Sequence, residues 1–166
     1  LTAAFPEIAA HRGRPVAVLA TGDPFNYGVG RQLAAVVPPD EILSLPQPSS
    51  FSLAASRLCW SLPDLTAVTL HGRPLESIVR HLQPGARILA LSWDQTTPEK
   101  LATLLVARRM GDSRISVLEA LGGPRERVRH TTAESFDLAG IDPLNLIGVE
   151  VAAAPDAAVV PLAPGL

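Results

Sequence analysis

The sequence predicts an α/β fold, in which short strands alternate with helices around a sheet. Short continuous apolar runs recur along the chain, as in strands that are buried on both faces. Turn signals rich in Gly and Pro, such as residues 21–24 and 121–124, close several of these runs. Hydrophobic residues make up 47% of the 166 residues and charged residues only 18%, which is enough apolar side chain to build a folded core.

Two strands and two helices are expected in the first part of the chain. The strands are residues 16–20, an apolar run that leads into a turn, and residues 42–45, which end before a proline-rich segment. A helix is expected near residues 27–37, because apolar side chains recur there on one helical face and two prolines follow. A second helix follows Ser49 and Ser50, whose hydroxyl groups can cap its first turn.

The second part of the chain repeats the pattern of strand, turn and helix. Strands are expected at residues 65–70, 87–91, 114–118, 128–131 and 146–151, the fourth of them at an edge. Helices are expected at residues 75–82, after Pro74, and from a start at residues 96–99. Residues 152–166 are rich in Ala and Pro and are expected to form a linker-like tail.

This alternation places candidate sites in the turns that follow strands. In open α/β sheets, ligands bind outside the carboxyl ends of the strands. The turns after Ala20, Leu70, Leu91 and Leu118 are therefore the first places to look for a functional site.

Composition limits the classes of function and the location. The net charge of −2 argues against a general electrostatic attraction to nucleic acid. All but one of the 14 basic residues are arginine, a bias that codon usage explains as well as carboxylate or phosphate recognition does. The single cysteine excludes an intramolecular disulfide and a cysteine-cluster metal site. No apolar run approaches the roughly 20 residues of a membrane span, and no signal-peptide pattern is present, so a cytoplasmic protein without a membrane partner is expected.

The most informative segment is TGDPFNYGVG, residues 21–30. Its three glycines let the backbone approach a ligand closely, and Asp23 can accept hydrogen bonds from the amides that follow it. The purely structural alternative is a tight turn that only precedes a helix. The segment lacks the ending of a Walker loop and the glycine spacing of a dinucleotide site, which disfavours an unrelated nucleotide-binding domain.

Four segments resemble, in the same order, those of the tetrapyrrole methylases, the family that methylates precorrins and uroporphyrinogen. Residues 22–28 are similar to its Gly-Asp-Pro-aromatic-Tyr-Gly motif, and residues 46–51 to its Pro-x-Pro-Ser-Ser segment. Residues 69–73 resemble the Ser-Leu-His-Gly-Arg signature of the branch that methylates carbon 5 of the macrocycle. Residues 118–127 resemble the Glu-x-Leu-Gly-x-Pro-x-Glu-Arg stretch of that branch, and the resemblance as a whole extends over about residues 15–151.

The resemblance implies two small α/β lobes, residues 1–64 and 65–151, with a cofactor cleft between them. It implies an S-adenosylmethionine-dependent C-methyltransferase that acts at carbon 5 of a precorrin-type tetrapyrrole in cobalamin (vitamin B12) biosynthesis, as a homodimer. Because the methyl donor is already activated, no metal is required, and catalysis would rest mainly on alignment and desolvation. The alternatives are methylation at another ring position and a non-catalytic module that binds only the cofactor or a partner domain.

The resemblance also implies site residues. Carried over by position, the cofactor bed consists of Gly22, Asp23, Pro24, Phe25, Ser49, Ser50, Leu91, Ser92, Ala120, Leu121, Gly122, Asn145 and Leu146. On the substrate side, Arg73 would clamp a carboxylate and His71 would accept a proton. In the purely structural alternative, His71 caps a strand end and Arg73 lies in solvent. Trp93 is a second ligand candidate, and the arginines of residues 125–129 are expected to be solvated or to line a substrate entrance.

The sequence departs from the family pattern at its start. Family members begin with a strand and a Gly-rich loop upstream of the position that Leu1 occupies here. Residues 161–166 resemble the linker of a fused enzyme in which a second, decarboxylating methyltransferase domain follows. The chain is therefore expected to be the first domain of such a fusion, or a fragment of it.

Overall fold

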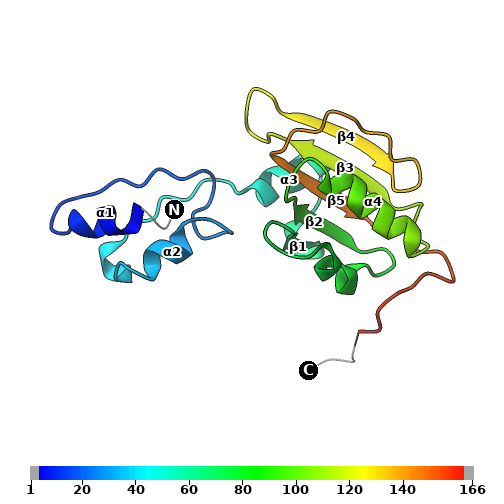
Figure 1. Cartoon of the computed structure of the whole chain (residues 1–166), viewed down its shortest axis with the longest axis horizontal. Coiled ribbons are helices and arrows are strands. Elements are labelled where there is room, and N and C mark those ends of the chain that lie inside the picture. The colour runs from blue at the N-terminus through cyan, green and yellow to red at the C-terminus, as the bar shows by residue number, and fades with distance from the viewer. Residues whose placement is uncertain (1–3, 163–166) are drawn as a thin grey trace. The chain divides into compact units, whose positions relative to one another are not determined.

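The computed structural model describes residues 4–162, which fall into two compact units (Figure 1). The units are Leu1–Ser49 and Ser50–Leu166. The boundary between lobes that the resemblance implies, after residue 64, stays a prediction. No helix within residues 4–162 has both the length and the apolar character that a membrane span requires.

The first unit has little regular structure. It contains α1 (Ala4–Ala10), α2 (Gly30–Ala34) and a 3₁₀ turn, η1 (Pro39–Glu41). The strands predicted at residues 16–20 and 42–45 are not formed, because neither run pairs with a strand in the part of the chain that the structure describes. Apolar side chains of both runs, including Leu19 and Leu43, are instead exposed. The helix predicted at residues 27–37 is shortened to α2, since a compact turn precedes it.

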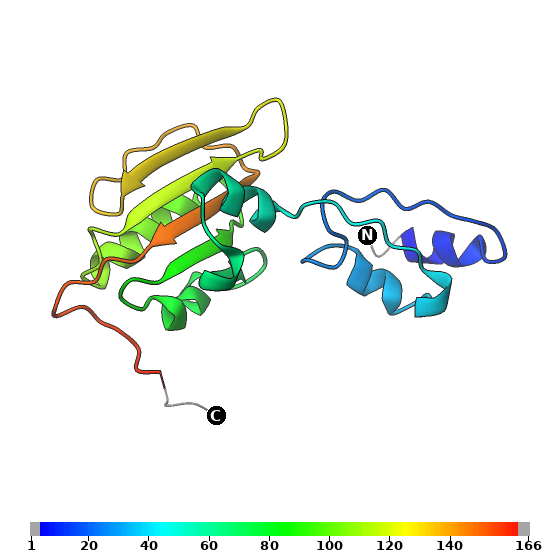
Figure 2. The same ribbon diagram turned by 180° about the vertical axis from the view of Figure 1, so that it is seen from behind.

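The second unit is a five-stranded sheet with helices on both faces (Figures 1 and 2). Its strands are β1 (Thr66–Thr69), β2 (Arg87–Leu91), β3 (Arg114–Glu119), β4 (Arg127–Thr132) and β5 (Asn145–Glu150). Its helices are α3 (Ser50–Leu58), α4 (Thr97–Ala107) and the 3₁₀ segments η2 (Leu62–Asp64) and η3 (Leu75–His81). Every strand predicted after residue 64 is therefore confirmed, and the helix predicted at residues 75–82 is a 3₁₀ helix.

Strand direction decides which loops meet. The strand order is β1-β2-β5-β3-β4, with β1 and β2 parallel and all other neighbours antiparallel. The carboxyl ends of β1, β2 and β3 therefore lie at the same edge of the sheet as the amino ends of β4 and β5. The register confirms this alignment, since Leu91 pairs with Leu146 and Glu119 pairs with both Asn145 and Arg127. We call this the site edge.

The sheet buries a core on each face, because side chains alternate between faces along a strand. On one face, Ile88 and Ile147 pack in a cluster that includes residues of α4 and η3. On the other face, Leu89 and Leu146 pack against α3. Burial on both sides explains why β2 and β5 have the continuous apolar sequences from which they were predicted.

The segment after β5 has no helix or strand as far as residue 162. It nevertheless packs on the core beneath α4, where Ala157 and Val159 are partly buried. Gln83 Nε2 donates a hydrogen bond to the carbonyl oxygen of Val160 (2.9 Å), which fixes the segment further.

Gly148 on β5 lies against the end of α3 and the residues that follow it. A Cβ at this position would lie 2.7 Å from Leu58 Cδ1 and 3.3 Å from Trp60 Cη2. Both contacts are shorter than ordinary van der Waals distances, so any side chain on residue 148 would push these two side chains away from the sheet.

Gly148→Val is expected to lower the free energy of unfolding by about 1–3 kcal/mol, because overpacking forces neighbouring side chains out of their preferred rotamers. Ala67→Val is the control, since residue 67 is exposed on β1 and the change there should alter stability by less than about 0.5 kcal/mol. Urea unfolding followed by circular dichroism measures both variants. Equal stability of the two would contradict the packing described for Gly148.

Candidate functional site

The predicted site residues that follow Ser50 in sequence gather at the site edge. They come from the turns after β1, β2 and β3 and from the start of β5: His71, Arg73, Leu91, Ser92, Ala120, Leu121, Gly122, Asn145 and Leu146. Ser50 is the first residue of α3, which packs on one face of the same sheet. Residues far apart in sequence thus meet because β5 lies between β2 and β3.

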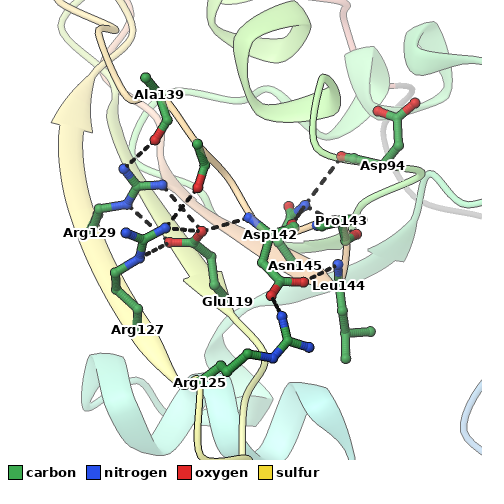
Figure 3. A network of polar contacts seen from close by, with 11 residues as sticks. Asp94, Glu119, Arg125, Arg127, Arg129, Ala139, Asp142, Pro143, Leu144 and Asn145 are labelled. Atoms are coloured by element: carbon green, nitrogen blue, oxygen red, sulfur yellow. Dashed lines mark hydrogen bonds and ion pairs between the residues drawn. The ribbon is translucent and has the colours of Figure 1, made fainter.

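Asn145 links the loop after β2 to the segment before β5. Its side chain and that of Ser92 are both only 8% exposed. Ser92 Oγ donates a hydrogen bond to Asn145 Oδ1. Asn145 Nδ2 donates to the carbonyl oxygens of Asp94 (3.2 Å) and Asp142 (2.9 Å) (Figure 3). Because a buried amide with filled hydrogen bonds strongly favours one arrangement of its partners, Asn145 holds these two loops in register.

The loop after β3 has a strained backbone. Ala120 has φ of +46° and Gly122 has φ of +77°, both in the left-handed region. For an alanine this conformation costs about 1 kcal/mol or more, and such strain is concentrated at functional sites. The Ala120 amide donates to the carbonyl oxygen of Leu144 (2.9 Å), which fixes the turn against the segment that leads into β5.

Glu126 also fixes the loop after β3. Gly122 N donates to Glu126 Oε2 (2.7 Å), and Arg57 on α3 donates to both carboxylate oxygens of Glu126. The Arg57 side chain and the Gly122 amide lower the pKa of Glu126, because both stabilise its charged form. The loop is therefore held to α3 through one carboxylate.

Glu119 is the centre of a larger ionic network at this edge (Figure 3). Its side chain is 1% exposed, and it accepts hydrogen bonds from the guanidinium groups of Arg127 and Arg129 and from the Asp142 amide (2.8 Å). Burial alone would raise the pKa of Glu119, but the hydrogen bonds from Arg127, Asp142 and Arg129 outweigh it and lower the pKa. The Glu119 carboxylate is therefore charged in the folded protein, and its oxygens are occupied by these hydrogen bonds.

The side chains of Arg125 and Arg127 are half or more exposed, as expected of solvated charge, but the arginines of residues 125–129 also have acidic partners that were not predicted. Arg127 and Arg129 neutralise a buried carboxylate, and Arg125 forms an ion pair with Asp142. Sequence reasoning did not assign a role to Glu119. A signal was present, since a hairpin between residues 114–118 and 128–131 places Glu119 opposite Arg127.

The turn after β1 carries the predicted substrate residues. His71 N donates to Thr69 Oγ1 (3.2 Å), and Arg73 N donates to the carbonyl oxygen of Leu70 (3.2 Å). Both side chains are exposed, and Arg73 has no ion pair among residues 4–162. This exposure suits a substrate-facing role and equally the alternative in which Arg73 lies in solvent. The His71 ring centroid lies 5.9 Å from that of Trp93, in the next turn along the edge.

The remaining predicted residues lie in the first unit, where the structure brings Gly22 and Ser49 together. Gly22 has φ of +65°, and a Cβ there would lie 3.3 Å from the carbonyl oxygen of Pro48 and 3.5 Å from Ser49 Cα. Gln47 N donates to the carbonyl oxygen of Gly22 (3.1 Å). The Gly-Asp-Pro turn and the Pro-x-Pro-Ser-Ser segment are therefore neighbours.

Asp23 and Pro24 close this turn from within. Asp23 Oδ1 accepts a hydrogen bond from Phe25 N (2.9 Å), and the carbonyl oxygen of Pro24 accepts one from Gly30 N (2.7 Å). A Cβ at Gly28 or Gly30 would lie within 2.7 Å of that carbonyl oxygen. The packing of the turn explains Gly28 and Gly30, as in the purely structural alternative. Gly22 is explained instead by its close approach to Pro48.

Metal ligands are not grouped at either location. Within residues 4–162, no group of three or more His, Cys, Asp or Glu side chains is placed to hold a metal ion. The site edge instead combines strained backbone, partly exposed leucines at residues 91 and 121, and exposed side chains in the turns after β1 and β2. Such a surface is suited to binding organic ligands by backbone, apolar and ionic contacts.

Comparison with known proteins identifies relatives over nearly the whole chain. Residues 2–137 match the family described as Tetrapyrrole (Corrin/Porphyrin) Methylases. The chain is 54% identical over 159 residues to a Sinorhizobium sp. protein named precorrin-6Y C(5,15)-methyltransferase (decarboxylating). It is 30% identical over 124 residues to the cobalt-precorrin-7 C(5)-methyltransferase of Salmonella typhimurium. These alignments cover 96% and 73% of this chain, but the chain spans only 38% and 59% of the two relatives.

Solved structures share the fold. The cobalamin biosynthesis precorrin-6Y methylase of Archaeoglobus fulgidus aligns with a TM-score of 0.62 at 30% identity, covering 89% of this chain and 70% of that one. A uroporphyrin-III C-methyl transferase of Thermus thermophilus, complexed with S-adenosyl homocysteine, aligns with a TM-score of 0.66 at 20% identity, covering 89% of this chain and 72% of that one. The predicted α/β fold of the tetrapyrrole methylase type is thus confirmed.

Glu119→Gln is expected to lower the free energy of unfolding at neutral pH by about 2 kcal/mol, the size of a lost hydrogen bond to a charged group. Glu76→Gln is the control, because residue 76 is exposed on η3 and the change removes the same charge. Urea unfolding at pH 7 measures both. A loss no larger for Glu119→Gln than for Glu76→Gln would contradict the role of this carboxylate.

The same pair predicts a pH dependence. Because folding lowers the pKa of Glu119, its stabilising contribution is complete above the pKa of an unfolded glutamate, about 4.3, and is lost as the pH falls through the folded pKa. The stability of Glu119→Gln should therefore fall less steeply below pH 4 than that of the wild type. Parallel acid limbs for the two proteins would show that folding does not lower the pKa of Glu119.

Proposed function

Because this chain belongs to the tetrapyrrole methylase family, we propose that it is an S-adenosylmethionine-dependent methyltransferase that acts at carbon 5 of a precorrin-type tetrapyrrole in cobalamin biosynthesis. Relatives of two kinds support this position. One is named for carbons 5 and 15 with decarboxylation, and the other for carbon 5 alone. The region that both share with this chain is accordingly assigned to carbon 5, and decarboxylation is not part of the proposal.

The observation that carries the proposal is the composition of the site edge. The positions after Ser50 that are implied for the cofactor and the His-Gly-Arg turn implied for the substrate lie at the ends of neighbouring strands of one sheet. Parallel and antiparallel neighbours are about 4.8 Å apart, so β1 and β3 are separated by about 14 Å across this edge.

The residues of the site edge fit S-adenosylmethionine. Gly122 is exposed in the loop after β3, and Leu91 and Leu121 are partly exposed at the same edge of the sheet. When bound, the cofactor supplies an electrophilic methyl group on a sulfonium, which a carbon nucleophile can accept without a metal. The polar atoms of the Asn145 side chain are hydrogen-bonded to Ser92 and to backbone carbonyl oxygens. We therefore assign Asn145 the role of positioning the residues of the cofactor bed.

The substrate side of the edge would orient the acceptor. The exposed guanidinium of Arg73 can bind a carboxylate substituent of the ring through two parallel hydrogen bonds. The exposed imidazole of His71 can accept the proton that the methylated carbon releases. Together these residues would fix which ring carbon faces the methyl group.

Calorimetric titration with S-adenosylhomocysteine tests cofactor binding. We expect saturable binding by the wild type, and about tenfold weaker binding by Asn145→Ala, which corresponds to about 1.4 kcal/mol and to one buried hydrogen bond. ATP is the control ligand, because the chain has no Walker loop. Binding of ATP in preference to S-adenosylhomocysteine would refute the proposal.

Methyl transfer itself is tested with cofactor labelled with ¹³C in its methyl group and a precorrin acceptor. The expected product has its label at carbon 5, as read by NMR. Label at another carbon would assign a different ring position. Saturable cofactor binding with no transfer would instead support the non-catalytic module and contradict the proposed activity.

Arg73→Ala is expected to lower kcat/KM for the precorrin about 10- to 100-fold, because a charged hydrogen-bonded contact with the substrate is lost. Its affinity for S-adenosylhomocysteine should stay unchanged. Arg80→Ala is the control, since Arg80 is an exposed arginine in the last turn of η3. Equal losses of substrate use and cofactor affinity in Arg73→Ala would refute the assigned role.

A further inference from the structure

The turn after β2 presents a large aromatic side chain to solvent. Trp93 is 56% exposed, although a tryptophan left in water forgoes much of the free energy that its burial would give. The other tryptophan behaves differently: Trp60 is partly buried against the core beneath α3, and the Arg87 guanidinium lies 5.5 Å from its ring. The exposure of Trp93 therefore calls for an explanation.

The loop that carries Trp93 is held in place by hydrogen bonds. Thr97 Oγ1 accepts hydrogen bonds from the amides of Trp93 and Asp94 (both 3.2 Å), and Asp94 Oδ1 accepts one from the Thr96 amide (2.8 Å). Asn145 Nδ2 donates to the carbonyl oxygen of Asp94. The ring thus projects from a fixed backbone, which is the condition for a binding contact of low entropic cost.

Trp93 has an aromatic neighbour in the turn that follows the adjacent strand, β1. The His71 ring lies 5.9 Å away, with an angle of 32° between the ring planes, so the two rings form a tilted pair that is open to solvent. Arg73, two residues beyond His71, adds an exposed positive charge that has no ion pair in the described part of the chain. The patch lies at the β1 and β2 end of the site edge, about 10 Å, or two strand spacings, from the loop after β3.

We propose that Trp93 and His71 form a platform against which one face of the tetrapyrrole ring packs, while Arg73 binds one of its carboxylates. This inference rests on the proposed function. A tetrapyrrole combines a broad apolar face with a rim of carboxylates, and the platform offers the matching pair of surfaces: aromatic faces and a guanidinium beside them. Trp93 is thereby a substrate-contacting residue for which the loop hydrogen bonds set the orientation.

The test is a titration with uroporphyrin III, a tetrapyrrole that carries eight carboxylates, followed by its absorbance and by calorimetry. Trp93→Ala is expected to weaken binding about tenfold, the usual effect of removing one aromatic stacking partner. Trp93→Phe should retain most of the affinity. Trp60→Phe is the matched control and should bind uroporphyrin III as the wild type does.

Titration of every variant with S-adenosylhomocysteine separates this inference from the proposed function. Unchanged uroporphyrin III affinity in Trp93→Ala, or a wild type that binds S-adenosylhomocysteine but not uroporphyrin III, overturns the platform and leaves the proposed function intact. A wild type that binds neither ligand overturns both. If Trp93→Ala fails to fold, as a loss of S-adenosylhomocysteine binding would show, Trp93→Phe and Trp93→Leu decide, since a platform requires that only the aromatic variant retain affinity.

Discussion

A carboxylate buried at the end of a strand must be neutralised, and the arrangement around Glu119 follows from that requirement. Arg127 and Arg129 supply the charge from the next strand of the hairpin, and the Asp142 amide adds a hydrogen bond from the segment that leads into β5. One side chain therefore joins the end of β3, the start of β4 and the approach to β5. The loop of residues 120–122 begins at the next residue, so its strained backbone is supported by this network.

The same principle of one polar group holding several loops recurs across the edge. Asn145 links the loops after β2 and before β5, and Glu126 links the loop after β3 to α3 through Arg57. The turn after β1 is different, because its polar side chains face outward. The edge thus has a rigid central part, which suits a bound cofactor, and an open end, which suits a larger ligand that must enter and leave.

Most strands and helices of the second unit could be predicted from the sequence, because local sequence patterns were sufficient to identify them. The apolar runs of β2 and β5 predict strands buried on both faces, and β4 follows from its position beyond a Gly-Pro turn. The runs at residues 16–20 and 42–45 carry the same local signal, yet a strand also needs a neighbour for its backbone hydrogen bonds, and none pairs with them in the described part of the chain. The meeting of Ser92 with Asn145, and of His71 with Trp93, depends on strand order, which no local pattern specifies.

The two outer strands of the sheet also have features that oppose backbone pairing with a second molecule. An unpaired strand invites backbone pairing with another molecule, and short length or charge on that strand opposes it. β1 has only 4 residues, and β4 carries Arg127 and Arg129 on one side of its backbone. The arginines that neutralise Glu119 thus have a second consequence: they place charged side chains on an outer strand, where charge disfavours backbone pairing with a second molecule.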